Sequence, residues 1–134
     1  MEKIMRIVGL GTDIVEIARL QDAVSRHEEH FLNRIYTPAE LLAAGKDSPR
    51  ISYCAGRWAA KEAAAKALGT GIGESCAFNE IEILYDPAGR PVMTISGSAA
   101  ATAGAFGVSE IKVSISHEKN YAVAVVILSG EARS

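Results

Sequence analysis

Apolar residues in the second half of the chain alternate with polar ones, which is typical of strands with one buried face. This alternation predicts strands at residues 81–85, 91–95 and 111–116. Two apolar runs, at residues 4–10 and 121–128, predict two further strands, and the length and composition of the second suit a buried one. Turn residues at 86–89 and 117–120 join neighbouring strands, so the pattern predicts two hairpins.

Helical spacing predicts the elements between these strands. Apolar residues recur at helical intervals from Ile14 onward. Thr37-Pro38-Ala39-Glu40 combines a capping box with proline at the first helical position, and Gly45 is expected to end this short helix. The longest helix is expected to begin at Ser48-Pro49 and to end at Leu68, because its residues are strong helix formers.

These elements predict an α+β fold. In it, an antiparallel sheet of about four to five strands packs against the long helix and shorter helices, the last of them at residues 98–106. The chain has 134 residues, which suits one domain over residues 1–134. A chain of this size buries about two-thirds of its unfolded surface, so one core is sufficient.

Charge and cysteine content exclude several classes of protein. The net charge is −2 and the sequence pI is near 5.9, whereas nucleic-acid-binding proteins usually carry a basic patch. The longest apolar run, residues 121–128, is too short to span a membrane. Cys54 and Cys76 lack the spacing of a metal or redox motif, so we expect buried thiols in a reducing compartment. The sequence therefore predicts a cytoplasmic protein without nucleic-acid or membrane partners.

A carboxylate and an ammonium group share one face of the long helix. Glu62 and Lys66 are four residues apart, and the helix runs into Gly69-Thr70-Gly71. The pair is either an ordinary ion pair on a solvated face or a pair that faces a ligand, for which the surrounding alanines leave room. Glycines offer backbone N–H groups to phosphate, but the dipole of a helix C-terminus repels anions. A phosphate there would need Lys66, Arg57 or a metal ion.

Two further polar residues stand at expected element ends. Asp13 is expected at or just beyond the end of the first strand, where it either caps the next helix or belongs to a site. Gly9-Leu10-Gly11 begins like a dinucleotide-binding fingerprint, but Ile14 stands in place of the third glycine, so we reject that motif. His117 lies at the mouth of the last hairpin, where it is either solvated or within reach of a ligand.

Three segments form a combination that covers nearly the whole chain. They are residues 9–17 (GLGTDIVEI), residues 57–63 (RWAAKEA) with Lys66 and the glycine loop, and residues 114–117 (SISH). This combination resembles the holo-[acyl-carrier-protein] synthases, the small single-domain type of 4′-phosphopantetheinyl transferase, and implies their fold. The resemblance implies that coenzyme A is cleaved at its pyrophosphate and that phosphopantetheine passes to a serine of an acyl carrier protein for fatty acid biosynthesis. Adenosine 3′,5′-bisphosphate is then the second product.

The resemblance also implies roles for individual residues. Asp13 and Glu62 would hold Mg²⁺, which prefers one or two carboxylates together with phosphate and water. Lys66 would contact the phosphates, and either Glu62 or a water on the metal would accept the proton of the serine. The expected coenzyme A pocket comprises Arg57, Lys66, Gly69, Thr70, Gly71, Pro91 and His117.

The same resemblance implies how the protein meets its partners. The carrier protein presents an acidic helix in this family, so Arg19, and after it Arg26, are expected to attract that helix. Members of the family usually form homotrimers with the active site at subunit interfaces.

Two other functions stay open on the sequence. One is the same chemistry on a carrier protein of peptide or polyketide synthesis, although such relatives are typically twice as long. The other is a non-catalytic module that binds coenzyme A or an acidic helix, although a binder would have no need of both carboxylates and Lys66.

Overall fold

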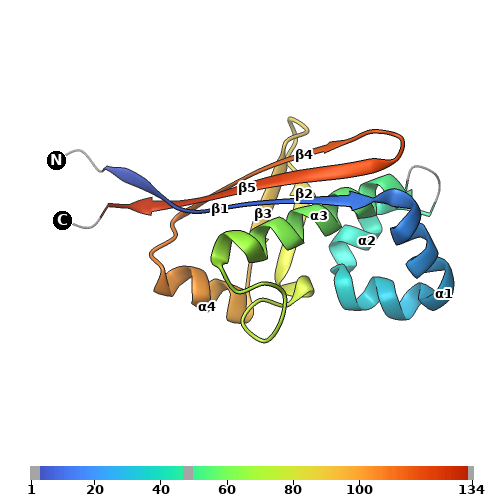
Figure 1. Cartoon of the computed structure of the whole chain (residues 1–134), viewed down its shortest axis with the longest axis horizontal. Coiled ribbons are helices and arrows are strands. Elements are labelled where there is room, and N and C mark those ends of the chain that lie inside the picture. Colours follow the sequence, from blue (N-terminus) through green and yellow to red (C-terminus); the bar gives the residue numbers. More distant parts are fainter. Residues whose placement is uncertain (1–3, 47–49, 133–134) are drawn as a thin grey trace.

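The computed structural model describes residues 4–46 and 50–132. Its strands are β1 (Met5–Glu16), β2 (Ile81–Tyr85), β3 (Pro91–Ile95), β4 (Glu110–His117) and β5 (Tyr121–Glu131). Its helices are α1 (Ile17–Ile35), α2 (Pro38–Ala44), α3 (Arg50–Leu68) and α4 (Gly97–Ala105), with a 3₁₀ turn, η1, at Phe78–Glu80. The helices gather on one side of the sheet that contains β1, β4 and β5 (Figure 1).

The α+β class is confirmed, but the strands form two sheets instead of one. β5 is the central strand of a sheet in the order β1-β5-β4, and β2 pairs with β3 in a separate hairpin. All of these pairings are antiparallel. The hairpin contacts β4 without extending its hydrogen-bond ladder. The central place of β5 explains the apolar run at residues 121–128, because this strand has a neighbour on each edge and α3 against one face.

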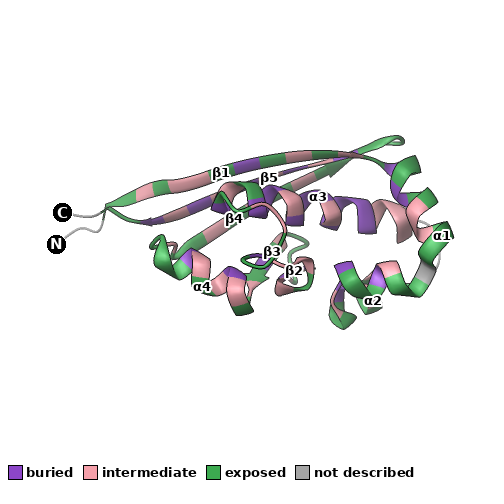
Figure 2. Ribbon diagram, turned by 60° about the horizontal axis from the view of Figure 1, so that its bottom comes forward, coloured by how far each residue is buried: buried purple, intermediate pink, exposed green. Residues whose placement is uncertain are grey.

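The long helix α3 packs on one face of the β1-β5-β4 sheet, and small residues allow a close approach. Much of α3 is buried (Figure 2), and its buried residues include Ala59, Ala60, Ala63, Ala64 and Ala65. A Cβ atom on Gly9 of β1 would clash with the carbonyl oxygen of Ala67, and one on Gly11 with that of Ala63. The backbone of β1 therefore lies directly against α3. This contact is the physical reason for the Gly9-Leu10-Gly11 sequence.

Strand β1 is longer than its pattern predicts, so the expected place of Asp13 at a strand end is wrong and its alternative role as a helix cap is excluded. Asp13 is not at a strand end, because β1 continues to Glu16 and pairs along its length with β5, with Asp13 opposite Ala124. Gly11 does not break the strand, since it fits against α3. The next helix begins at Ile17 and not near Ile14, and its N-cap is Glu16, so Asp13 does not cap it.

Most other boundaries agree with the predictions. The capping box of Thr37 and Glu40 precedes α2, and Gly45 follows it with a φ of 72°. Helix α3 ends at Leu68 as expected, whereas its predicted start at Ser48-Pro49 lies outside the described residues. Both cysteines are buried free thiols. Among the described residues, no helix is both long and apolar enough to cross a membrane.

A buried ion pair that the sequence did not predict joins α2, α3 and β2. Lys61 Nζ lies 2.7 Å from Glu40 Oε1, and both side chains are fully buried. Lys61 also donates to the carbonyl oxygen of Ile81, and Glu40 accepts from the N–H of Ile83. Burial lowers the pKa of Lys61, and the charge of Glu40 opposes that shift. Because Lys61 directly precedes Glu62, this network fixes the part of α3 that carries Glu62.

Candidate active site

The centre of the site is a contact between β1 and the C-terminal half of α3. Lys66 Nζ donates to Asp13 Oδ1 at 2.9 Å and to the carbonyl oxygen of Thr12 at 3.1 Å. The side chain of Lys66 is 53% exposed and that of Asp13 only 16%, so the lysine reaches a more enclosed carboxylate from the rim. Lys66 thus pairs across elements with Asp13, and the ordinary pair with Glu62 along the helix is not formed.

Glu62 lies one helical turn before Lys66, close enough to Asp13 for their charges to interact. Burial raises the pKa of Glu62, the charge of Asp13 raises it further, and Lys66 lowers it. Two carboxylates and one ammonium group leave a net negative charge at this point. The site therefore favours a further cation.

The donor set fits a magnesium ion. Mg²⁺ is usually held by one or two carboxylates, while substrate phosphates and water complete its shell. Asp13 and Glu62 supply two such oxygen ligands from two different elements, and both line the same pocket. Within residues 4–46 and 50–132, no group of three or more His, Cys, Asp or Glu residues converges.

A pocket opens beside the two carboxylates, between β1, α1 and α3. Besides Asp13 and Glu62, its lining includes Arg19 of α1 and the aromatic rings of Phe31 and Trp58. These two rings stack with centroids 5.8 Å apart. The pocket therefore combines a charged end with an apolar wall.

The two predicted docking arginines lie on the exposed side of α1. Arg19 lines the carboxylate pocket, and Arg26 is exposed seven residues further along. Seven residues amount to about two helical turns, so both side chains project from nearly the same face of α1. The two arginines thus lie on one face of α1 next to the acidic site, with the exposed carboxylates of Asp22 and Glu29 at neighbouring helical positions.

The predicted residues Arg57 and His117 meet on another side of α3. They line a cavity of about 170 Å³ together with Tyr53 of α3 and Tyr85 of β2. Pro91 pairs with Tyr85 across the β2–β3 hairpin but does not line this cavity. The sequence analysis missed both tyrosines. Tyr53 has a local signal, four residues before an arginine on a helix, whereas Tyr85 comes from a separate element and has none.

The carboxylate pocket and the arginine cavity are distinct. No residue lines both of them. Arg57 precedes Glu62 by five residues, which is about 7.5 Å along the helix axis and about 140° around it. The structure therefore brings Asp13, Glu62 and Lys66 together in one place and Arg57 and His117 together in another, whereas Pro91 lines neither pocket.

The glycine loop caps α3. Gly69 and Gly71 have φ angles of 82° and 65°, where a side chain would be strained. The N–H of Gly69 donates to the carbonyl of Lys66, and those of Thr70 and Gly71 donate to the carbonyl of Ala65. These three N–H groups are engaged in a helix C-cap, so the expectation that they are open to phosphate is not met. Binding of coenzyme A by this loop stays a prediction.

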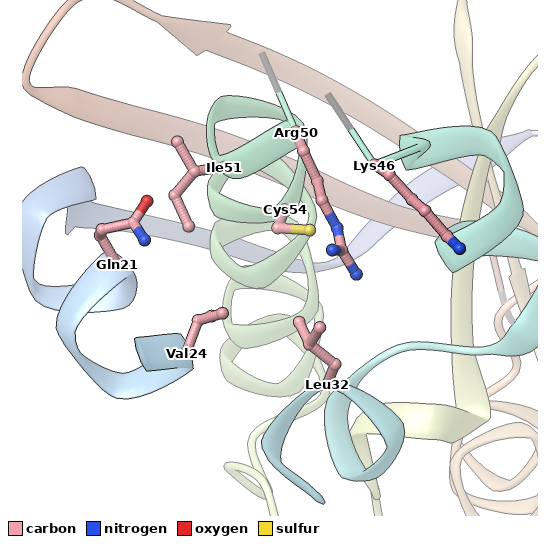
Figure 3. Close-up of a pocket in the computed structure, with 7 residues that line it drawn as sticks. All are labelled: Gln21, Val24, Leu32, Lys46, Arg50, Ile51 and Cys54. Carbon is pink, nitrogen blue, oxygen red and sulfur yellow. The ribbon is translucent and has the colours of Figure 1, made fainter. Parts of the chain in front are cut away.

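Another hollow lies between α1 and the start of α3 (Figure 3). Its lining residues are Gln21, Val24, Leu32, Lys46, Arg50, Ile51 and Cys54. None of these belongs to the predicted site, and none lines the carboxylate pocket or the arginine cavity. We therefore do not include this hollow in the candidate site.

Sequence comparison identifies the class of protein that carries this fold and site. The 4′-phosphopantetheinyl transferase superfamily matches residues 9–126, which include most of β1, all of α3 and the first half of β5. The chain belongs to this superfamily. Within it, the holo-[acyl-carrier-protein] synthase of Solidesulfovibrio magneticus is 52% identical over 124 residues, which cover 92% of this chain and 99% of that protein.

Solved structures agree with this assignment. The holo-[acyl-carrier-protein] synthase from Neisseria meningitidis has a TM-score of 0.85 at 36% identity and covers 92% of this chain and 98% of its own. The enzyme of Helicobacter pylori, solved in complex with coenzyme A, has a TM-score of 0.79 at 36% identity, with coverage of 89% and 98%. The predicted resemblance to holo-[acyl-carrier-protein] synthases and the predicted fold class are confirmed.

Proposed function

We propose that this protein transfers the 4′-phosphopantetheine group of coenzyme A to a serine hydroxyl of an apo acyl carrier protein, in fatty acid biosynthesis. The observation that carries the proposal is the pairing of Asp13 and Lys66 at 2.9 Å beside Glu62. Phosphoryl transfer depends on neutralised charge and aligned reactants more than on covalent help, and these are the groups that supply both. The relatives with this name, and the one bound to coenzyme A, support the choice of substrates.

We further propose Mg²⁺ as the cofactor, held by Asp13 and Glu62. When bound, Mg²⁺ neutralises charge on phosphate oxygens. Lys66 orients the Asp13 carboxylate through its hydrogen bond and adds positive charge at the rim, where the leaving bisphosphate would pass. Glu62 is one candidate for the acceptor of the serine proton, because carboxylates beside a reacting group commonly act as general bases. A water molecule on the metal is the alternative acceptor.

We propose that the protein forms a homotrimer with active sites at subunit interfaces. The carboxylate pocket and the arginine cavity lie on different sides of α3, so neighbouring copies would supply the two parts of one coenzyme A site. The uncovered face of the sheet supports association, because Ile7, Leu10 and Ile14 of β1 are 69%, 64% and 62% exposed on it. A hollow lined by Ile14 and His117 connects this face with the region of the cavity.

The exposed guanidinium groups of Arg19 and Arg26 on α1 support an acidic carrier protein as the acceptor. Arg19 and Arg26 would attract it over a distance and orient its serine toward the carboxylate pocket, which chiefly raises the association rate. We place the reaction in the cytoplasm, since the buried thiols of Cys54 and Cys76 are unpaired, as is usual in a reducing compartment.

The test is an intact-mass measurement on an apo acyl carrier protein incubated with coenzyme A, Mg²⁺ and the purified protein. We expect the carrier to gain the mass of phosphopantetheine.

Asp13→Ala and Glu62→Ala should lose most turnover while staying folded, because each removes a metal ligand. Arg19→Glu should raise the KM for the carrier and weaken its salt dependence while leaving the KM for coenzyme A unchanged.

Each outcome has a distinct meaning. If coenzyme A binds but the carrier gains no mass at saturating concentrations, the protein is the non-catalytic binding module. Wild-type rates in Asp13→Ala or Glu62→Ala at low Mg²⁺ would remove the metal assignment. An unchanged KM for the carrier in Arg19→Glu at low salt would remove this arginine from the docking surface.

A further inference from the structure

Arg57 is a buried cation with unsatisfied donors. It is 1% exposed, and its Nε and Nη2 atoms have no hydrogen-bond partner. A buried charge is costly unless it is paired and hydrogen-bonded. Native proteins seldom leave such donors unsatisfied, and a guanidinium that borders a cavity in this state indicates an anionic ligand.

Two tyrosine rings hold this guanidinium. Its central carbon lies 3.6 Å from the ring centroid of Tyr53 and 4.5 Å from that of Tyr85. The rings themselves are 6.3 Å apart and meet edge to face at 71°. Tyr53 lies one turn before Arg57 on α3, whereas Tyr85 reaches across from β2. The cation is therefore fixed from two directions by two different elements.

Aromatic rings differ from a carboxylate in their effect on the charge and the N–H donors of Arg57. A carboxylate would neutralise the arginine and occupy its N–H donors. The ring faces attract the cation through their quadrupole and leave its charge and donors for a ligand. The hydroxyl of Tyr53 is also buried without a partner, so a second donor lies beside the guanidinium.

The cavity next to these groups is small. Its volume of about 170 Å³ is below the roughly 300 Å³ at which pockets for whole small molecules begin, so it suits one group of a larger ligand. Arg57 and His117 both line it. A guanidinium, an imidazole and a phenol around a small space are the donors expected for a phosphate group.

We propose that Tyr53 and Tyr85 are positioning residues, which hold the Arg57 guanidinium toward one phosphate group of coenzyme A. The Tyr53 hydroxyl is a further donor to that phosphate. This inference rests on the coenzyme A binding proposed above. The phosphate is either the 3′-phosphate of the ribose or the 5′-phosphate that begins the pyrophosphate, and the two are separated by the choice of ligand.

The test is calorimetric titration of the full chain with adenosine 3′,5′-bisphosphate and with adenosine 5′-monophosphate, which requires no turnover. We expect Tyr85→Leu to weaken bisphosphate binding roughly tenfold, as expected for a lost desolvated cation–π contact. Tyr85→Phe keeps the ring and should stay within about twofold. Tyr53→Phe keeps its ring but loses the hydroxyl, which should weaken binding by about threefold to tenfold.

Folding controls are available on the surface. Tyr85 is 53% exposed, so its truncation leaves no large cavity. Phe106 is a matched aromatic residue, 48% exposed, at the end of α4 and outside both pockets. Phe106→Leu should leave binding unchanged, and melting temperatures of all variants should confirm that they are folded.

The two ligands identify the phosphate. If the 3′-phosphate enters the cavity, Tyr85→Leu weakens the binding of the bisphosphate only. If the 5′-phosphate enters it, Tyr85→Leu weakens the binding of both ligands equally.

The proposal is overturned if Tyr85→Leu binds the bisphosphate like wild type, or if Tyr85→Phe binds it as weakly as Tyr85→Leu. If the wild type binds the bisphosphate but never modifies a carrier, the proposed function fails and the positioning role stands. If the wild type modifies the carrier while Tyr85→Leu binds normally, only the positioning role fails.

Discussion

Four charged side chains within ten residues of α3 occupy different environments. Lys66 is largely exposed and meets a carboxylate of another element, and Glu62 is half-buried beside that same carboxylate. Lys61 is sealed in an ion pair, and Arg57 is enclosed by aromatic rings. Burial and partner, more than residue type, therefore separate the charges that can meet a ligand from the one that only supports the helix.

Lys61 provides a stability prediction at this scale. Lys61→Met should cost about 3–5 kcal/mol of unfolding free energy, because it leaves Glu40 buried without its cation. The double variant Lys61→Met/Glu40→Met should lose less than the sum of the two single losses. Urea denaturation measures all of these free energies.

Lys66→Met is the matched control for this cycle. Its side chain is 53% exposed, so the loss of its ion pair should cost no more than about 1 kcal/mol. Equal destabilisation by Lys61→Met and Lys66→Met, or strictly additive losses in the Lys61 and Glu40 cycle, would contradict the buried network.

Local sequence predicts part of the site at the level of single residues. Glu62 and Lys66 share a helical stripe, which spacing alone reveals. The partner of Lys66 is a different matter, since Asp13 lies 53 positions away and only the packing of β1 on α3 brings it near. Lys61 and Lys66 are indistinguishable by residue type, so the buried pair with Glu40 could not be foreseen.

At the level of elements, β1 and α3 form one unit whose spacing is set by glycine. The close backbone approach at Gly9 and Gly11 brings Asp13 within hydrogen-bond distance of Lys66. The ligand geometry thus depends on two positions that have no chemistry of their own.

Gly11→Ala tests this dependence. Its Cβ would overlap the Ala63 carbonyl, so β1 and α3 must separate, at a cost of about 1–3 kcal/mol. Transferase turnover should fall more than stability explains, because Asp13 moves away from Glu62. Thermal melting and turnover well below the melting temperature measure the two effects.

Gly104→Ala in α4 is the comparison, because a Cβ there meets nothing within 4 Å. It should stabilise the protein by up to about 1 kcal/mol and leave turnover unchanged. If Gly11→Ala behaves like Gly104→Ala, the glycines of β1 do not set the geometry of the site.

The elements were predicted correctly where the sequence periodicity is strong. The prediction failed where the extent of a strand depends on pairing with residues far away in the sequence. The capping box before α2 and the alternation of β2, β3 and β4 are local signals, and each gave its element. The end of β1 was misplaced, because a partner strand more than a hundred residues later extends it past two glycines. The division into two sheets has no local signal either.

At the level of the whole molecule, the separation of the carboxylate pocket from the arginine cavity is the main feature. If neighbouring copies complete each other, variants defective in different halves should restore function when mixed. We expect Glu62→Ala and Arg57→Leu, each inactive alone, to regain a measurable fraction of turnover after coexpression, because some interfaces combine two intact halves.

Coexpression of Glu62→Ala with Asp13→Ala is the control. Both substitutions alter the carboxylate pocket, so every subunit interface in a mixed assembly contains a defective carboxylate pocket. Purification through two different tags ensures that mixed assemblies are measured. Mixed assemblies of Glu62→Ala and Arg57→Leu with no activity, or a monomer of full activity by light scattering, would contradict the shared site.

The pairing of β1 with β5 also has a consequence for how the chain is made. Strand β1 leaves the ribosome more than a hundred residues before its neighbour β5, since Met5 is opposite Glu131. Until synthesis approaches that residue, one edge of β1 and the alanine face of α3 lack their cover. The nascent chain therefore stays partly exposed until β5 has been synthesised, and its three-stranded sheet can form only then.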